Sequence, residues 1–319
     1  MILDKLPKIK TLRWIFGDQL NANHSWYADK CENTLYVIAE LPQETNYVCH
    51  HVQKVCAFFL AMEAFSKSLQ SRGHKVLHLT LDDSAEYVSL KKLVEVIITR
   101  TGCSIFEYQR PDEHRLLSQL QELSSQLSIT TKEVDSEHFL MPFEELPSHF
   151  RPKTSVRMEM FYRKMRKRFN ILMANDGPLG ERWNFDKENR KSFSKKSLSE
   201  IPEPLIFKND ARAVMARLEK HKIKTIGVAD DNLLWPIDKT QSLQLLGHFC
   251  EFGLSRFGLY QDAMTANSEY QWSLYHSRLS FSLNTKILHP MQVIQTAIQS
   301  FENSNGEINL AQVEGFIRQ

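Results

Sequence analysis

Five short β-type segments alternate with helical stretches through the first 135 residues, and this alternation limits the possible folds of the chain more than any other feature. The β-type segments, rich in β-branched and aromatic residues, cover 12–17, 34–40, 75–81, 104–108 and 129–134. Apolar residues at three- and four-residue steps predict helices between them, over 52–69, 88–97 and 116–127. Strands that alternate with helices favour a parallel sheet with helices on both faces. We therefore predict an N-terminal Rossmann-like α/β domain with a parallel five-stranded sheet.

The second half of the chain has a different pattern. From about residue 209 the periodicity is helical, over 211–221, 240–252, 290–301 and 310–319, and no convincing strand appears. We expect an α/β domain over 1–135, a connector over 136–208 and an all-α domain over 209–319. The apolar periodicity continues to Gln319, and no glycine, proline or polar tail ends the helix. We therefore expect the helical domain to be incomplete and the chain to be truncated.

Positive charge is concentrated in the connector. Residues 151–196 hold fourteen Lys and Arg against five Asp and Glu, a balance of 14 − 5 = +9, whereas the rest of the chain carries 26 − 33 = −7. Aromatic residues are interleaved with these cations. Such a cluster of cations and aromatic residues suits the binding of a polyphosphate, of which nucleic acid is the commonest. A solvated basic helix and loop accounts for the charge alone about equally well.

Other features exclude some classes of protein. No uncharged run approaches the roughly 18 residues of a membrane span, and the first residues lack the apolar stretch of a signal peptide. The five cysteines are scattered and never form a CxxC pair, which indicates reduced thiols in a cytoplasmic protein and neither a disulfide framework nor a zinc site. Neither GxGxxG nor GxxxxGK[ST] occurs, so a classical dinucleotide or P-loop site lacks support.

Ligands of open α/β sheets bind beyond the carboxyl ends of the strands. That rule selects Gly17 and Asp18 after the first strand, and Glu40 and Glu44 after the second, although ordinary turn chemistry explains them about as well. In the helical half, serines around Ser277 and Ser280 stand where a helix begins. They suit either a phosphate or a simple helix cap, and the cap is favoured.

Several strings together resemble the photolyase–cryptochrome superfamily, and specifically its bacterial iron–sulfur branch of prokaryotic (6-4) photolyases and related cryptochromes. They are FGDQL at 16–20, MEMFYRKMR at 158–166, RWNFDKENR at 182–190, FG with QDAM at 257–264, LSF at 279–281 and VEGFIRQ at 313–319. The similarity runs from about Leu12 to the last residue. Lys286 departs from the pattern, because relatives usually have glycine there.

The resemblance implies a light-driven DNA repair flavoprotein that acts as a monomer. In that family the α/β domain holds an antenna, here 6,7-dimethyl-8-ribityllumazine, and the helical domain holds FAD and a four-iron four-sulfur cluster. Reduced FAD, once excited, gives an electron to a UV photoproduct in DNA, here a (6-4) photoproduct. The catalytic residues and cluster cysteines are expected beyond Gln319, so we assign no catalytic residue and expect no cluster in this chain.

The resemblance also assigns site residues. Antenna contacts would be Phe16, Gly17, Asp18, Glu40, Glu44 and Phe58; flavin contacts would be Tyr260, Ser277, Leu279 and Ser280. DNA phosphates would meet Arg163, Arg166, Lys167, Arg182 and Arg190, and Asp186 would hold a Mg²⁺. Two alternatives stay open: a blue-light sensor of the cryptochrome type that does not repair DNA, and a catalytically inactive remnant that keeps only chromophore or DNA binding. The resemblance is to a DNA photolyase of the (6-4) type, and we expect this 319-residue chain alone to be inactive.

Overall fold

The computed structural model describes residues 2–87, 89–175 and 177–319. Contacts between residues divide the chain into two compact units, each built from three separate segments. Unit 1 comprises the residues up to His138, Ile206–Gln241 and Phe281–Leu288, and unit 2 comprises Phe139–Leu205, Ser242–Ser280 and His289–Gln319. Packing thus groups part of the expected helical domain with the sheet. The functional division into 1–135, 136–208 and 209–319 stays a prediction.

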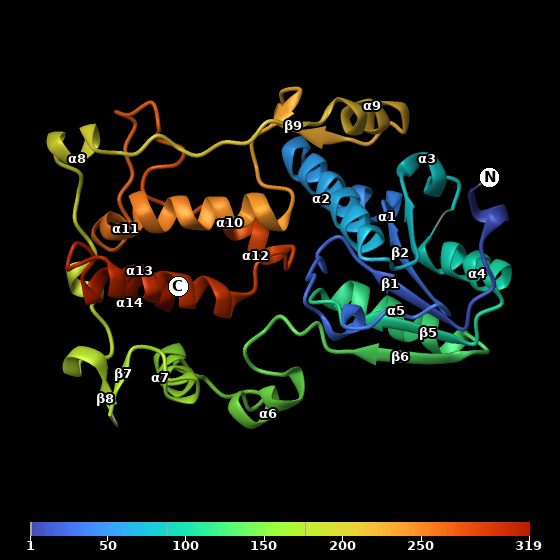
Figure 1. Ribbon diagram of the computed structural model, residues 1–319, viewed down its shortest axis with the longest axis horizontal. Coiled ribbons are helices and arrows are strands. Elements are labelled where there is room, and N and C mark those ends of the chain that lie inside the picture. The colour runs from blue at the N-terminus through green and yellow to red at the C-terminus, as the bar shows by residue number, and fades with distance from the viewer. Residues whose placement is uncertain (1, 88, 176) are drawn as a thin grey trace. The chain divides into compact units, whose positions relative to one another are not determined.

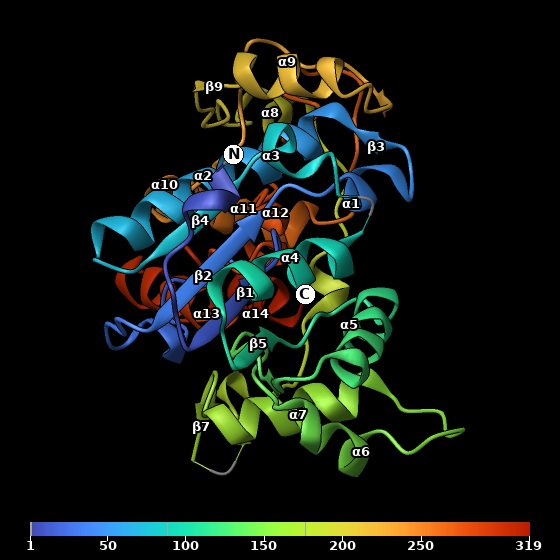
Figure 2. The same cartoon turned by 90° about the vertical axis from the view of Figure 1, so that its right-hand side faces the viewer.

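Unit 1 is built on the parallel five-stranded sheet that the sequence predicts (Figures 1 and 2). Its strands are β1 (Thr11–Ile15), β2 (Thr34–Ala39), β4 (Val76–Leu79), β5 (Ile105–Gln109) and β6 (Thr130–Val134), in the order β4-β2-β1-β5-β6. In the central strand, Trp14 pairs with Val37 on one side and Tyr108 on the other. The sheet order reverses between β1 and β5, which makes this position the topological switch point.

Helices cover both faces of the sheet, as predicted, because successive strand residues point to opposite faces. Trp14 packs in a buried cluster with residues of α4 (Leu90–Thr101) and α5 (His114–Gln126). Its neighbour Ile15 packs instead with α2 (Val52–Ser71). The helix expected from residue 88 begins at Leu90, where the Ser89 side chain caps it; Val88 lies outside the described residues.

Smaller elements complete unit 1. They are η1 (Ile2–Lys5), η2 (Ser25–Tyr27), α1 (Pro42–Asn46), β3 (His50–His51), α3 (Leu81–Ser84), β9 (Asn209–Asp210), α9 (Arg212–Lys220), β10 (Thr225–Ile226) and β11 (Asn232–Leu233). The strands β9, β10 and β11 correct the expectation of no strand after residue 209. Each has two residues, which is too short for a period-two pattern to be visible in the sequence.

Unit 2 contains the basic helix α7 (Met158–Phe169) and the C-terminal helices. The other elements of its first segment are η3 (Phe143–Glu145), α6 (Leu146–His149), β7 (Met173–Ala174), β8 (Gly177–Pro178), η4 (Leu179–Glu181), η5 (Asp186–Glu188) and α8 (Lys195–Ser199). The later helices are α11 (Leu254–Tyr260), α13 (Pro290–Asn303) and α14 (Leu310–Arg318), with α14 packed against both others. Two helices, α10 (Lys239–His248) and α12 (Ser280–Asn284), cross a unit boundary along the chain.

One predicted helix is interrupted. The stretch expected as a single helix over 240–252 is α10 followed by a π-helical turn, η6 (Phe249–Gly253). Within the described part of the chain, no helix combines the length and apolar character needed to cross a bilayer. Cys31 and Cys49 are exposed free thiols, and Cys56, Cys103 and Cys250 are buried ones.

Candidate functional site

The carboxyl ends of β1 and β5 meet at the switch point of unit 1. Gly17 and Asp18 follow β1, and Asp112 lies beyond the end of β5. Gln19 joins the two strand ends: its Oε1 accepts from the Phe16 amide at 3.1 Å, and its Nε2 donates to the Gln109 carbonyl at 3.0 Å. This is the crevice where open α/β sheets usually bind ligands.

A lysine of the chain itself occupies this crevice. The Lys286 side chain is 1% exposed, and its Nζ donates to the Asp18 carbonyl oxygen at 2.8 Å and to Asp112 Oδ2 at 2.7 Å. Asp18 Oδ2 lies 3.9 Å from the same nitrogen. Burial raises the pKa of Asp18, and the Lys286 ammonium opposes this rise. The ammonium therefore bridges the loops on both sides of the switch point.

Apolar side chains fill the space above Gly17. A Cβ atom added to Gly17 would lie 3.0 Å from Met62 Sδ and 3.1 Å from Phe58 Cδ1, so both side chains of α2 press against the glycine backbone. The Phe58 ring makes an edge-to-face contact with Phe281, with centroids 5.4 Å apart. The glycine here permits close packing within the protein.

The two acidic residues after β2 are each held by an arginine. The fully buried Glu40 carboxylate accepts from Arg217 Nη2 and from the Leu81 amide, both at 2.8 Å. Glu44 accepts two bonds from Arg115, at 3.2 and 2.7 Å. Burial raises the pKa of Glu40, and Arg217 counteracts this effect.

These contacts do not fit 6,7-dimethyl-8-ribityllumazine. Its bicyclic ring and ribityl chain need an open apolar slot and free polar groups. Glu40 and Glu44 instead bind arginine side chains of the protein, and the Asp18 carboxylate lies 3.9 Å from Lys286 Nζ. Phe16 is 6% exposed and belongs to the core, and Phe58 packs on Gly17. The side chains that the resemblance assigns to the antenna are occupied with internal contacts.

The residues assigned to FAD do not form a flavin cavity either. The Tyr260 ring stacks against Phe193, at 4.8 Å between centroids, and against Tyr275, at 5.6 Å, and these two rings also lie 6.3 Å from each other. Leu279 is 1% exposed and Ser280 lies on the surface. The cavity that Ser277 lines has a volume of about 20 Å³. That holds about one water molecule, whereas sites for organic ligands span roughly 300–1,000 Å³.

Arg166 of the basic helix is a structural residue. Its side chain is buried, and its guanidinium donates to the carbonyl oxygens of Ile171 at 3.0 Å, Trp183 at 3.2 Å and Leu172. These bonds tie α7 to the two loops that follow it. Arg166 is therefore withdrawn from phosphates, and we leave it out of the set of proposed DNA contacts.

The other cations of α7 are accessible. Lys164 and Lys167 are exposed, and Arg163 is half-buried and pairs with Glu159 at 2.9 Å. The charged ends of Arg163 and Lys167 lie 5.3 and 5.6 Å from the centre of the Trp183 ring, which holds them on one side of the helix. These cations can move to meet a phosphate, because an exposed ion pair is worth little.

Beyond α7, Arg182 and Arg190 are exposed, and each is paired with an acidic residue. The partner of Arg190 is Asp186, which also accepts from Arg318 at 3.0 Å. The Arg318 guanidinium lowers the pKa of Asp186. Two arginines thus saturate the carboxylate assigned to Mg²⁺, and the described residues contain no group of three or more potential metal ligands. The surroundings of Asp186 do not fit a divalent cation.

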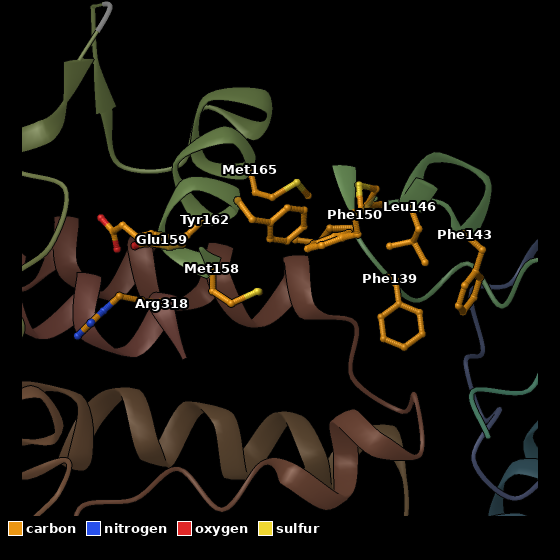
Figure 3. A pocket seen from close by; sticks show the side chains of 12 residues that line it. Phe139, Phe143, Leu146, Phe150, Met158, Glu159, Tyr162, Met165 and Arg318 are labelled. Carbon is orange, nitrogen blue, oxygen red and sulfur yellow. The ribbon is translucent and has the colours of Figure 1, made fainter. Parts of the chain in front are cut away.

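An apolar cavity of about 730 Å³ is lined in part by side chains of α7. Figure 3 shows Phe139 and Phe143 at one end and Glu159 and Arg318 at the other. It is lined by Phe139, Leu140, Met141, Phe143, Leu146, Phe150, Met158, Glu159, Phe161, Tyr162, Met165 and Arg318. Glu159 pairs with Arg163, and Arg318 pairs with Asp186. The cavity therefore offers apolar contact area but few oriented polar groups.

Four residues that bind side chains or loops at these sites were assigned no role from the sequence. They are Asp112, Arg115, Arg217 and Lys286, and Lys286 was noted only as a departure from the family pattern. Lys286 lies 268 residues from Asp18, and Arg217 lies 177 residues from Glu40. A single sequence has no local pattern for pairs at such separations. The one available signal was a lysine where the family usually has glycine.

Comparisons with known proteins find similarity to photolyases and to a photolyase-related family. The family described as "Deoxyribodipyrimidine photo-lyase-related protein" matches residues 13–234. A protein named (6-4) photolyase, from Agrobacterium fabrum (strain C58 / ATCC 33970), is 30% identical over 309 residues, which cover 96% of this chain and 59% of that protein.

Among solved structures, a bacterial class III photolyase from Agrobacterium tumefaciens matches with a TM-score of 0.53 and 14% identity. That match covers 98% of this chain and 57% of the other, and it supports the fold alone. The chain thus spans less than three-fifths of the length of the relatives that it matches.

Proposed function

The chain belongs to the deoxyribodipyrimidine photo-lyase-related protein family, and on this premise we propose that it takes part in the light-driven repair of UV-damaged DNA. We propose the (6-4) photoproduct as its lesion. The observation that carries this proposal is the 30% identity to a protein named (6-4) photolyase, over 96% of the chain. The coverage supports a shared ancestry of both units and not of the α/β unit alone.

The part of this function that the described residues support best is contact with DNA phosphates. Lys164 and Lys167 are exposed and Arg163 is half-buried beside them on α7, while Arg182 and Arg190 follow in exposed loops. Cations of this kind bind the backbone of any sequence, so they position the nucleic acid without reading its bases. The net balance of +9 over residues 151–196 attracts a polyanion from the surrounding solution.

FAD is the cofactor that the family resemblance implies, and it would supply the light-driven redox chemistry. Because Tyr260, Ser277, Leu279 and Ser280 do not enclose a cavity of flavin size, we derive no chemical step through FAD. The experiment must therefore supply the cofactor.

The test uses the purified 319-residue chain, FAD under reducing conditions, and an oligonucleotide with one (6-4) photoproduct. Repair by this chain predicts that near-UV or blue light converts the lesion to intact bases in proportion to exposure, whereas a dark sample shows no conversion. An oligonucleotide with a cyclobutane dimer serves as the matched substrate, and we expect slower conversion of it. Equal amounts of (6-4) photoproduct in light and dark, with FAD present, would exclude repair by this chain.

A second candidate is a DNA-binding protein that performs no repair. The cavity of about 20 Å³ beside Ser277 favours it, because a chain that does not enclose FAD retains its cationic surface all the same. This candidate predicts binding of damaged DNA without light-dependent loss of the lesion. The illumination experiment separates the two candidates directly.

A further inference from the structure

Eight residues enter unit 1 from a stretch of the chain that otherwise belongs to unit 2. The segment Phe281–Leu288 packs with the sheet, although the residues before and after it pack elsewhere. Hydrogen bonds hold it in place: the Leu20 amide donates to the Thr285 carbonyl at 2.8 Å, and Lys239 Nζ donates to the Ile287 carbonyl at 3.0 Å. The segment is therefore an integral part of the unit that contains the switch point.

Lys286 sits in this segment with a backbone that suits another residue. Its φ angle is +62°, in the left-handed region that glycine adopts without steric cost. Its side chain is also only 1% exposed, so its N–H groups have lost almost all contact with water, which is costly unless protein acceptors replace the water. Two unfavourable features at one lysine point to a compensating interaction of its side chain.

That interaction is provided by oxygen atoms of Asp18 and Asp112 around the ammonium group. A primary ammonium has three donors. Around Lys286 Nζ lie the Asp18 carbonyl oxygen at 2.8 Å, Asp112 Oδ2 at 2.7 Å and Asp18 Oδ2 at 3.9 Å. The first two are within hydrogen-bond distance and the third adds a charge of opposite sign. Asp18 follows β1 and Asp112 follows β5, so the two residues lie on opposite sides of the point where the strand order reverses.

We propose that Asp18 and Asp112 form an ammonium-binding site at the switch point, and that Lys286 is its built-in ligand. Phe58, Met62 and Phe281 close the apolar side of the same crevice. An exchangeable chromophore therefore does not bind there. This site lies within unit 1 and is independent of the proposed action on DNA.

Chemical rescue tests the ammonium site. In the full chain, Lys286→Gly removes the ligand and suits the φ angle, and n-butylammonium reproduces the deleted side chain. We expect n-butylammonium to raise the Tm of the variant in a saturable manner and to leave that of the parent unchanged. Tetramethylammonium, which has no N–H donor, should raise neither. Equal shifts in parent and variant, or equal rescue by both cations, would overturn the proposal.

Lys286→Met covers the case in which the glycine variant does not fold. Methionine keeps an unbranched apolar stem but leaves Asp18 and Asp112 without their cation, so the Tm should fall by several degrees. Lys75→Met is the matched control, because it removes an exposed lysine that pairs with Glu32 at 2.9 Å. A methionine variant at position 286 as stable as this control contradicts a bound ammonium.

Uptake of 6,7-dimethyl-8-ribityllumazine tests the closed crevice. We expect the parent chain and Lys75→Met to retain no lumazine fluorescence after incubation and gel filtration. One lumazine retained per parent chain would overturn the statement that the crevice is closed. DNA binding plays no part in this readout, so its result is separate from that of the repair experiment.

Discussion

At the scale of single residues, the pair of Glu40 and Arg217 shows how unit 1 keeps a buried charge. Glu40 is fully buried and Arg217 is 14% exposed, with 2.8 Å between Glu40 Oε1 and Arg217 Nη2. We expect Arg217→Met to lower the free energy of unfolding by about 3–5 kcal/mol, because it leaves the carboxylate buried without a cationic partner. Urea unfolding measures this change. The exposed pair lost in Lys75→Met should cost less than about 1 kcal/mol, and equal losses in the two variants would contradict the account.

His24 should make the stability of the protein depend on pH. Its Nδ1 accepts from the Trp26 amide at 3.0 Å and its Nε2 lies 2.9 Å from the Asp135 carbonyl, an arrangement that requires the neutral ring. Burial lowers the pKa of His24 below its usual 6.5. The unfolded chain then binds more protons than the native one between the two pKa values, so stability is full above about pH 6.5 and falls as the pH drops below it.

The substitution His24→Asn tests this dependence, because asparagine can still cap η2 but does not titrate in this range. We expect the Tm of the variant to fall less between pH 7 and pH 5 than that of the parent. Part of the fall should remain, because burial also lowers the pKa of His74 and of His78. An unchanged slope would show that His24 does not contribute.

Sequence reasoning identified residue types at the candidate sites better than their partners. It selected Asp18, Glu40 and Glu44 because they follow strands, and that position depends only on local pattern. It could not identify Arg115, Arg217 or Asp112, because the pairing of distant side chains follows from tertiary packing. Arg166 illustrates the same limit. Its charge is visible in the sequence, but its burial depends on loops whose paths the sequence does not show.

At the scale of elements, neighbouring residues of α7 differ in what they contribute to stability. Arg166 bonds three carbonyl groups of the following loops, whereas Lys167 is exposed one position later. We expect Arg166→Met to lower the free energy of unfolding by about 2–4 kcal/mol, because buried carbonyls lose their donors. Lys167→Gln should change it by less than about 0.5 kcal/mol. Urea unfolding of both variants would refute this division of roles if their stabilities were equal.

The elements with long periodic patterns were the ones that the sequence predicted well. The helix over 52–69 and the five strands of the sheet were confirmed, because each repeats a period often enough to be recognised. The two-residue strands β9 to β11 were missed for the opposite reason. The π-helical turn after α10 was also missed, since one extra residue in a turn leaves the apolar pattern nearly unchanged.

At the scale of the whole molecule, the fold class followed from the sequence but the grouping of segments did not. Residues 206–241 and 281–288 pack with the sheet, although their pattern resembles that of the helical half. Local periodicity shows which face of a helix is apolar and not which unit covers it. The same reasoning separates the two candidate functions: chromophore contacts need particular packing, whereas phosphate contacts need only accessible charge.

The central claim is that the cations of α7 contact DNA phosphates, and the salt dependence of DNA binding tests it most directly. Affinity for UV-damaged and intact duplexes should fall steeply with salt, and Arg163→Gln with Lys164→Gln and Lys167→Gln should reduce the slope of log K against log salt by up to about three units. The control replaces Lys30, Lys92 and Lys224, three exposed lysines of unit 1, by Gln, with the same change of charge. We predict that the control keeps the slope of the parent. If the two triple variants share one slope, the cations of α7 do not contact DNA.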